Sequence, residues 1–191
     1  MSYFATAGQM LVEFVFGIAC LLLLLRVMLQ WVRADFHNPI CQFLYLVTNP
    51  VLTPLGRVFP VVRGLNTAGL VVAWVVQTLK WLVLGLLVGK LLPPLALAVF
   101  GLYSVIDLTL LVLIILIVVR IVLSFVAPDG YHPLVPLLYR LTEPLMAPAR
   151  ALIPSVGGLD FSPILVMLAL ALARILVATP IFDLGQYLAR G

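Results

Sequence analysis

Charged residues are scarce in this chain, since Asp, Glu, Lys and Arg make up only 9% of its 191 residues. In a soluble domain about a quarter of the residues are charged, so the composition excludes an ordinary water-soluble protein. Hydrophobic residues make up 64%, and the net charge of +4 is dispersed, without a run of Lys or Arg. Nucleic-acid-binding proteins show a concentrated basic face, so we expect lipid around this chain and no nucleic-acid partner.

Cysteines and catalytic motifs are scarce as well. Cys20 and Cys41 belong to no Cys-x-x-Cys pair and to no Cys/His cluster, so we expect ordinary packed thiols rather than a disulfide or a metal site. The chain also lacks a glycine-rich phosphate loop and a recognisable Ser/His/Asp set. We therefore expect no enzyme, no bound metal and no cofactor.

Long apolar stretches are what the chain has instead. A helix of about 20 apolar residues crosses the hydrocarbon layer of a bilayer. Four stretches are long enough, over residues 8–32, 68–88, 102–126 (with a start as early as Pro94) and 162–182. These stretches predict an all-α integral membrane protein with four transmembrane helices. The first stretch contains Glu13 and has no basic segment before it, so we expect it to be retained rather than cleaved as a signal peptide.

Two proline-rich segments separate the predicted membrane helices. Within residues 38–60, Pro39 and Pro50 each begin a short helix and Pro60 ends the second, and residues 132–154 repeat this pattern. A helix of about ten residues covers only about 15 Å, which is too short to cross. We expect helical hairpins that lie flat in the membrane interface, because charge deep in lipid is costly, with a re-entrant pair as the alternative. The charged residues that favour the interface are Arg57, Arg140, Glu143 and Arg150.

The chain aligns with itself, without a gap, when it is shifted by 94 residues. Between Arg26 and Asn66, 14 of 41 positions are then identical, and the matches include prolines. The alignment predicts two tandem units, residues 1–93 and 94–191, each with a membrane helix, a hairpin and a second membrane helix. Each unit has an even number of crossings, so both have the same orientation, and a pseudo-twofold axis along the membrane normal is expected.

The matching positions, with the polar residues around them, form a candidate hairpin motif. Its members are Arg26, Pro39, Tyr45, Thr48, Pro50, Pro54, Arg57 and Pro60 in the first unit, and Arg120, Pro133, Tyr139, Thr142, Glu143, Pro144, Pro148, Arg150, Pro154, Gly158, Asp160, Ser162 and Pro163 in the second.

The same shift pairs charged residues inside the predicted membrane helices. Glu13 aligns with Asp107, and Lys80 aligns with Arg174, so each unit has an acid in its first helix and a base in its second. A charge at mid-bilayer costs at least about 2.5 kcal/mol, so these groups must face protein, water or one another. We favour ion pairs that fix helix packing, with an ion path around the pseudo-twofold axis as the alternative.

Three further residues lie near the hairpin ends of the membrane helices. Arg26 and Arg120 are within snorkelling reach of the border, so we expect interfacial anchors. The alternative is that each arginine holds its own hairpin, through backbone carbonyls or a carboxylate such as Asp35 or Asp129. Asp160 precedes the fourth membrane helix, where we expect it to cap free amides and complement the helix dipole.

Basic residues are more frequent in the hairpin segments than on the opposite side of the predicted membrane. The hairpin segments hold Arg33, Arg57, Arg63, Arg140 and Arg150, against Lys90 and Arg190 on the other side. Short cytoplasmic loops carry an excess of Lys and Arg. The pattern predicts cytoplasmic hairpins and periplasmic termini.

Two runs of the second unit, Tyr139 to Leu145 and Gly158 to Ile164, flank Pro148 and Arg150. This pattern resembles the YggT family of bacterial inner-membrane proteins, and the related YlmG proteins of Gram-positive bacteria and plastids are similar to a single unit. The first unit departs from the pattern. Asn49 replaces Glu143, and Asn66-Thr67-Ala68-Gly69 stands where the second unit has Asp160-Phe161-Ser162-Pro163.

The resemblance implies an inner-membrane location and no enzyme activity. Members of the family are linked to cell-division or envelope organisation, to osmotic and ion homeostasis, and in plastids to assembly of a cytochrome complex. We expect a non-enzymatic scaffold or assembly factor whose hairpins dock other membrane or envelope proteins, with a homo-oligomer also compatible. The alternative is an ion-flux component for K⁺ or osmotic homeostasis that uses the paired intramembrane charges.

Overall fold

The computed structural model describes residues 3–35, 37–126, 134–152 and 160–190. Four residues named above, Asp129, Pro133, Pro154 and Gly158, lie outside these ranges. The elements are α1 (Tyr3–Trp31), α2 (Pro39–Leu55), β1 (Val61–Val62), β2 (Leu65–Asn66), α3 (Thr67–Leu87), α4 (Pro94–Val126), α5 (Leu134–Leu152), α6 (Ser162–Ala173), the π-helix η1 (Arg174–Ala178) and α7 (Thr179–Arg190).

Among the described residues, four helices are long and apolar enough to cross a membrane: α1, α3, α4 and the stretch Ser162–Arg190 made of α6, η1 and α7. The predicted all-α class and the four helices of membrane-spanning length and composition are confirmed. The third helix begins at the earlier of its two predicted starts, Pro94, and the fourth continues to Arg190 instead of ending at residue 182.

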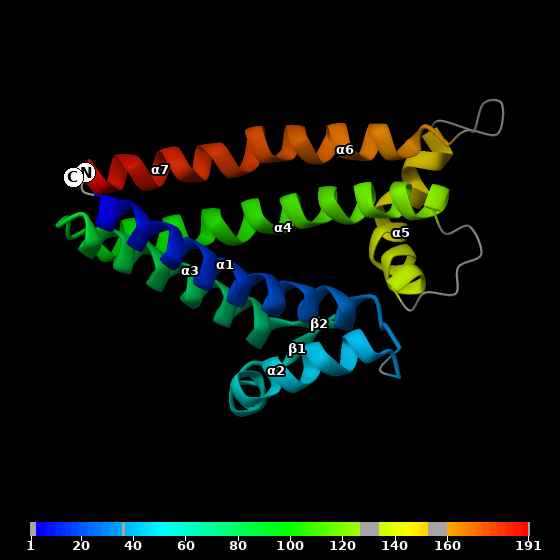
Figure 1. The fold of residues 1–191 in the computed structure, drawn as a ribbon, viewed down its shortest axis with the longest axis horizontal. Helices are drawn as coiled ribbons and strands as arrows, with labels where there is room; N and C mark the ends of the chain where they lie inside the picture. The colour runs from blue at the N-terminus through cyan, green and yellow to red at the C-terminus, as the bar shows by residue number, and fades with distance from the viewer. Residues whose placement is uncertain (1–2, 36, 127–133, 153–159, 191) are drawn as a thin grey trace.

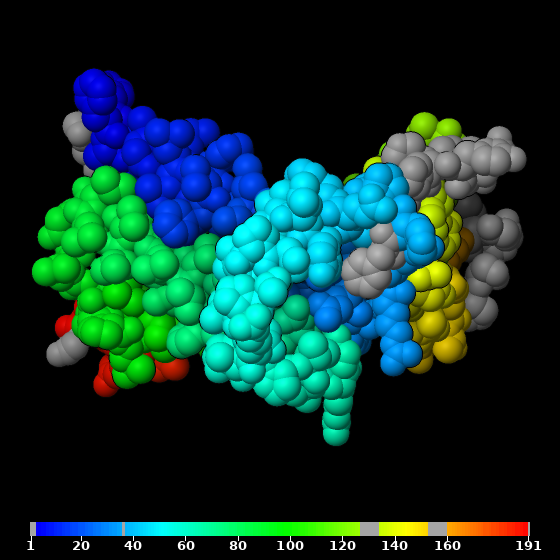
Figure 2. All heavy atoms as spheres, turned by 90° about the horizontal axis from the view of Figure 1, so that it is seen from below, coloured from blue at the N-terminus to red at the C-terminus, as the bar shows by residue number. Residues whose placement is uncertain are grey.

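The membrane helices form an open row. Figure 1 shows both termini and the turn between α3 and α4 at one end of the molecule, with α2 and α5 toward the other end. Along the row α1 packs on α3, α3 packs on α4, and α4 packs on α6 and α7. Seen from below, α1 and α7 lie at opposite edges of the end that holds the termini (Figure 2). The two outer helices therefore do not close the row into a ring at that end.

Small residues allow the central helices of the row to approach closely. A Cβ atom on Gly101 of α4 would meet the hydroxyl and the backbone nitrogen of Thr78 in α3. Contacts of this kind are typical of helix pairs in membranes. Two side chains add bonds between the helices, because Trp74 Nε1 donates to the Ala98 carbonyl at 2.9 Å and Trp81 Nε1 donates to Ser104 Oγ at 2.8 Å.

The helices α2 and α5, which lie in the two predicted hairpin segments, are called the hairpin helices. Apolar contacts join them across the molecule. Cys41 and Leu44 of α2 share a buried cluster with Leu137 and Leu141 of α5 and with Leu29 of α1. This cluster couples the positions of α2 and α5. Two further clusters fill the α1–α3 side and the α4–α5–α6 side of the row.

The predicted division of each hairpin into two short helices is wrong. Both α2 and α5 are continuous, with Pro50 and Pro54 inside the first and Pro144 and Pro148 inside the second. A proline removes one helical hydrogen bond and forces a bend, and the remaining bonds and the buried face of each helix preserve the helix beyond it. In Figure 1, α5 crosses the ends of α4 and α6, whereas α2 runs back beneath α1 and α3.

A short β-hairpin before α3 was not predicted. β1 and β2 pair in antiparallel fashion, and both turn residues have positive φ, 51° at Arg63 and 85° at Gly64. Two-residue hairpin turns of this type favour glycine, so Gly64 was the available signal. At the end of β2, Asn66 donates to Gln30 Oε1 of α1 at 3.0 Å and accepts from the Gly69 amide, which caps α3.

Candidate functional site

A chain of charged side chains lies where α5 meets the end of α4 and the start of α6. Glu143 of α5 accepts from Arg120 of α4 at 3.2 Å, and from two nitrogens of Arg150 at 2.8 and 3.3 Å. Arg150 also donates from Nε to Asp160 at 3.2 Å. We call Arg120, Glu143, Arg150 and Asp160 the Glu143 network. It ties α4, α5 and the start of α6 together.

Local structure explains how these groups meet. Glu143 and Arg150 are seven residues apart, which is two helical turns, so their side chains lie on one face of α5. Arg120 reaches α5 from the last two turns of the membrane helix and also donates to Thr142 Oγ1 at 2.7 Å. The side chain of Arg120 is only 9% exposed, whereas that of Glu143 is 43% exposed. The network thus runs from a buried cation to carboxylates that reach the surface.

Asp160 closes the network at the start of α6. Its carboxylate accepts hydrogen bonds from the amide and the hydroxyl of Ser162, the first residue of that helix. A carboxylate in this position satisfies a helix amide that would otherwise have no partner and complements the helix dipole. Asp160 therefore links the cap of α6 to Arg150 of α5.

Hydrogen bonding keeps both carboxylates of the network ionised. Hydrogen bonds from Arg150, and then from Arg120, lower the pKa of Glu143. Hydrogen bonds from Ser162 and Arg150 lower the pKa of Asp160. The bond to Glu143 correspondingly raises the pKa of Arg150. Glu143, Arg150 and Asp160 are therefore charged at neutral pH.

Beneath each hairpin helix an arginine of the membrane helix lies against a tyrosine ring. The guanidinium carbon of Arg26 is 4.4 Å from the centroid of Tyr45, and that of Arg120 is 4.0 Å from the centroid of Tyr139. Both arginines are 8% exposed, so the expectation that they snorkel to the interface as anchors is corrected. The hairpin helices cover them, and the contact is a cation–π interaction. The geometry is that of the alternative, in which each arginine holds its own hairpin.

The threonine three residues after each tyrosine makes the same hydrogen bond in both hairpin helices. Thr48 and Thr142 are buried, and each hydroxyl donates to a carbonyl four residues earlier, on Leu44 and Leu138 respectively. The two predicted units therefore share the contact that places the hairpin helix. They differ in the Glu143 network, since Asn49, Gly56 and Asn66 occupy the positions of Glu143, Arg150 and Asp160.

Comparison with known proteins identifies chains that are similar along most of their length. The family model described as CCB3/YggT matches residues 6–87 and 99–181. The uncharacterized protein PA0392 of Pseudomonas aeruginosa is 38% identical over 176 residues, covering 90% of this chain and 88% of that protein. The uncharacterized protein YggT of Escherichia coli strain K12 is 35% identical over 171 residues, covering 90% and 89%. No solved structure matches the chain.

The chain belongs to the CCB3/YggT family. The two segments matched by the CCB3/YggT family model fall one in each predicted unit, and each contains one of the buried arginine–tyrosine pairs. The curated relatives are described as uncharacterized, so the chemistry of this YggT-family chain must be argued from its own residues.

The four intramembrane charges of this YggT-family chain do not behave alike. Asp107 of α4 accepts from Arg174 through both oxygens, at 2.7 and 3.0 Å. Glu13 and Lys80 form no ion pair within the described ranges. Lys80 instead points to α4, where its Nζ lies 3.4 Å from Ser104 Oγ, and Glu13 is exposed on the outer surface of α1. The predicted pairing thus occurs between Asp107 and Arg174 but not between Glu13 and Lys80, because Lys80 turns to Ser104 of α4.

The other predicted motif residues lie around the hairpin helices rather than in the Glu143 network. Pro39 begins α2, Arg57 is exposed beyond its end, and the Pro60 carbonyl accepts from the Thr67 hydroxyl. Ser162 is buried at the start of α6, and Pro163 follows it. No group of His, Cys, Asp and Glu among the described residues has the arrangement needed to hold a metal ion.

Sequence reasoning missed the polar contacts between α3 and α4. Trp74 and Trp81 of α3 and Ser104 of α4 supply the inter-helix bonds described above. Their depth within two predicted spans was the signal, because a polar group in a membrane helix normally faces protein.

Proposed function

We propose that this YggT-family chain is a non-enzymatic membrane scaffold that uses its hairpin helices, α5 above all, to bind other membrane or envelope proteins. The observation that carries the proposal is the Glu143 network. It fixes α5 through charged contacts to α4 and to the start of α6 that lie at the edge of the buried apolar face of α5. Its residues hold the helix in place and leave the face opposite the buried apolar residues exposed.

The outward face of α5 has the character of a rigid binding surface. Its exposed residues recur every three or four positions, so they form one helical stripe: Pro136, Arg140, Pro144, Ala147 and Ala151. Small side chains and prolines lose little conformational entropy when a partner binds. This argument supports protein binding at the stripe without requiring any reaction there.

Two finer features complete the proposal. The units are parallel tandem copies, residues 1–93 and 94–191, which the internal sequence identities and the recurring arginine–tyrosine contact support. The hairpins face the cytoplasm of a bacterial inner membrane, which the arginine excess supports. Labelling Arg57→Cys and Lys90→Cys in intact inner-membrane vesicles of known orientation, with a maleimide that cannot cross membranes, tests the second feature. The two cysteines should label from opposite sides, with Arg57→Cys on the cytoplasmic side.

Site-specific photocrosslinking in cells tests the scaffold proposal. A photoreactive residue at Ala147, within the stripe, should give discrete crosslinked products, and Glu143→Gln should weaken them because α5 is less firmly held. The matched control is the same residue at Val118, which is exposed on the membrane helix α4. Equal products from both positions, or none from Ala147 in well-folded protein, would contradict the proposal.

The second candidate function is ion flux, which the Asp107–Arg174 pair and the exposed Glu13 favour. Against it, the row of helices is open at the termini, and the cavity between α1 and α4 has an apolar lining. Purified protein in liposomes should therefore pass no K⁺. A K⁺ flux that the Glu13→Gln/Asp107→Asn double variant alters would favour ion transport over the scaffold.

A further inference from the structure

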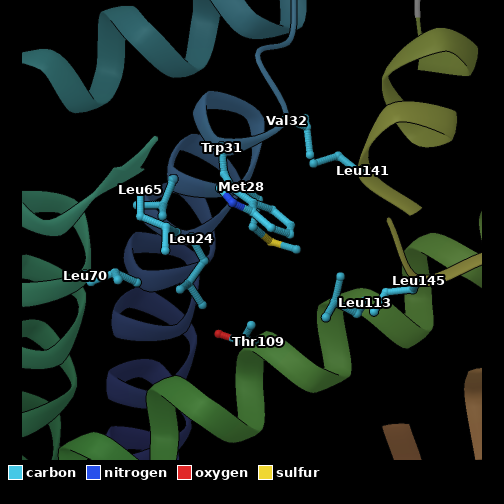
Figure 3. A pocket seen from close by; sticks show the side chains of 11 residues that line it. Leu24, Met28, Trp31, Val32, Leu65, Leu70, Thr109, Leu113, Leu141 and Leu145 are labelled. Carbon is cyan, nitrogen blue, oxygen red and sulfur yellow. The ribbon is translucent and has the colours of Figure 1, made fainter. Parts of the chain in front are cut away.

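An apolar cleft of about 350 Å³ separates the two predicted units on the hairpin side of the membrane. Figure 3 shows its lining, with Leu24 and Met28 of α1 on one side and Leu113 of α4 and Leu145 of α5 on the other. Ligand pockets have volumes of about 300 to 1,000 Å³. The cleft is thus large enough for part of a small molecule or a chain.

The chemistry of the lining excludes most ligands except hydrocarbon. Thr109 is the one residue of the lining with a side-chain hydroxyl, and that group already donates to the Val105 carbonyl at 2.7 Å. The other lining residues are aliphatic, apart from Trp31 at the edge, which is 47% exposed. Water finds no free partner among such side chains. An acyl chain from the surrounding bilayer has the matching chemistry.

A second cavity, which shares Trp31 and Val32 with the cleft, lies at its hairpin end and is lined by Arg140 and Glu143. Glu143 is bound by Arg120 and Arg150 within the network. Arg140 donates to the Arg33 carbonyl at 3.0 Å and forms no ion pair within the described part of the chain. The mouth of the cleft, at the hairpin end of the membrane helices, therefore presents an arginine that forms no ion pair, although the carboxylate of Asp35 lies near it.

We propose that the cleft holds one acyl chain of an anionic phospholipid, with the lipid phosphate on Arg140 and the indole of Trp31 beside the glycerol region. Arginine matches phosphate geometry better than any other side chain, and tryptophan is enriched at this depth. Leu141 and Leu145 of α5 contact the chain, so the lipid fills the space between α1 and the second hairpin.

Quenching of tryptophan fluorescence by brominated lipids tests the proposal. The protein is reconstituted in phosphatidylcholine vesicles that contain a minority of lipid with brominated acyl chains, as phosphatidylglycerol or as phosphatidylcholine. Trp31→Phe identifies the contribution of Trp31 against those of Trp74 and Trp81. Brominated phosphatidylglycerol should quench Trp31 about fivefold more effectively than brominated phosphatidylcholine, the effect expected of one arginine at an anionic headgroup.

Two variants with matched controls separate the headgroup from the chain. Arg140→Gln should abolish the preference for phosphatidylglycerol, while Arg57→Gln, an exposed hairpin arginine outside the cleft, should leave it unchanged. Thr109→Phe should fill the cleft and reduce quenching by both lipids, while Val118→Phe on the same helix should not. Equal quenching by the two lipids that no variant alters would mean ordinary boundary lipid and would overturn the proposal. Complete protection of Trp31 from both lipids would also overturn it, since protein would then cover the cleft.

Discussion

The two hairpin helices occupy equivalent places in the sequence but are held by different chemistry. Each covers a buried arginine with a tyrosine ring and bonds its threonine hydroxyl to its own backbone. Only α5 adds charged contacts, through the Glu143 network, whereas the segment after α2 uses a β-hairpin and the neutral amide of Asn66. The shared residues therefore place each helix on its membrane helix. The differing residues determine how firmly each helix and the chain after it are fixed.

The largest expected effect comes from the contact that holds the two units together. Gly101→Leu places a side chain against the backbone of Thr78, where no space exists, and overpacking of this kind costs about 1–3 kcal/mol or more. Both hairpin helices should lose protection together, because their shared apolar cluster depends on the α3–α4 contact. Hydrogen–deuterium exchange of α2 and α5 peptides in detergent measures this effect. Gly17→Leu on α1 is the control, since a Cβ at Gly17 meets nothing within 4 Å.

Removing the carboxylate of the network should affect α5 alone. Glu143→Gln leaves the buried cation of Arg120 without its anion, and we expect local opening of α5 to become easier by about 1–2 kcal/mol after allowing for the exposed side of Glu143. Asn49→Ala at the matching position of α2 should change protection by less than about 0.5 kcal/mol. Equal losses in both helices would contradict the contrast between them.

Acid should also destabilise α5 more than α2. The folded-state pKa values of Glu143 and Asp160 lie below their ordinary values. Their contribution to stability is therefore complete above the unfolded pKa values of about 4 and is lost as pH falls through the lower folded values. Exchange rates corrected for intrinsic pH dependence should rise earlier for α5 than for α2. The Glu143→Gln variant should show a smaller difference.

The smallest effect is expected from transferring part of the network to α2. Asn49→Glu with Gly56→Arg recreates a pair two turns apart, at the end of α2 where backbone φ is −64° and suits arginine. An exposed pair of this kind contributes about 0–1 kcal/mol, so α2 should exchange slightly more slowly. Gly56→Arg alone serves as the control, and slowing by the single variant would show that the charge pair is not the cause.

Most of the secondary structure could be predicted because it depends on local properties. Hydropathy identified the four membrane helices, and prolines marked the hairpin segments. The rule that proline divides a helix failed at Pro50 and Pro144, since packing against the membrane helices sustains α2 and α5 through the bends. Local rules do not include such tertiary contacts.

The sequence predicted which residues belong to the candidate site but not most of the contacts between them. Spacing alone links Glu143 with Arg150, but the contacts to Arg120 and Asp160 depend on where α5 crosses α4 and α6. In the same way, the alignment of Glu13 with Asp107 and of Lys80 with Arg174 suggested an ion pair in each predicted unit. Because α4 lies beside α3, Lys80 contacts Ser104 instead, and only the Asp107–Arg174 pair forms. The cleft lined by Trp31 was inaccessible to sequence reasoning, because it depends on how the two units diverge.

The π-helix η1 determines which side chains of the following helix α7 face α4. A π-turn holds one residue more than an α-turn, and each residue of an α-helix advances the chain by about 100°. With this extra residue, Arg174 meets Asp107 while, farther along, Phe182 packs on Tyr103 with ring centroids 4.9 Å apart and Gly185 abuts Phe100. Deleting one residue from η1 would keep the span and its composition but turn α7 by about a quarter of a revolution, so the aromatic contacts and the ion pair could no longer face α4 together.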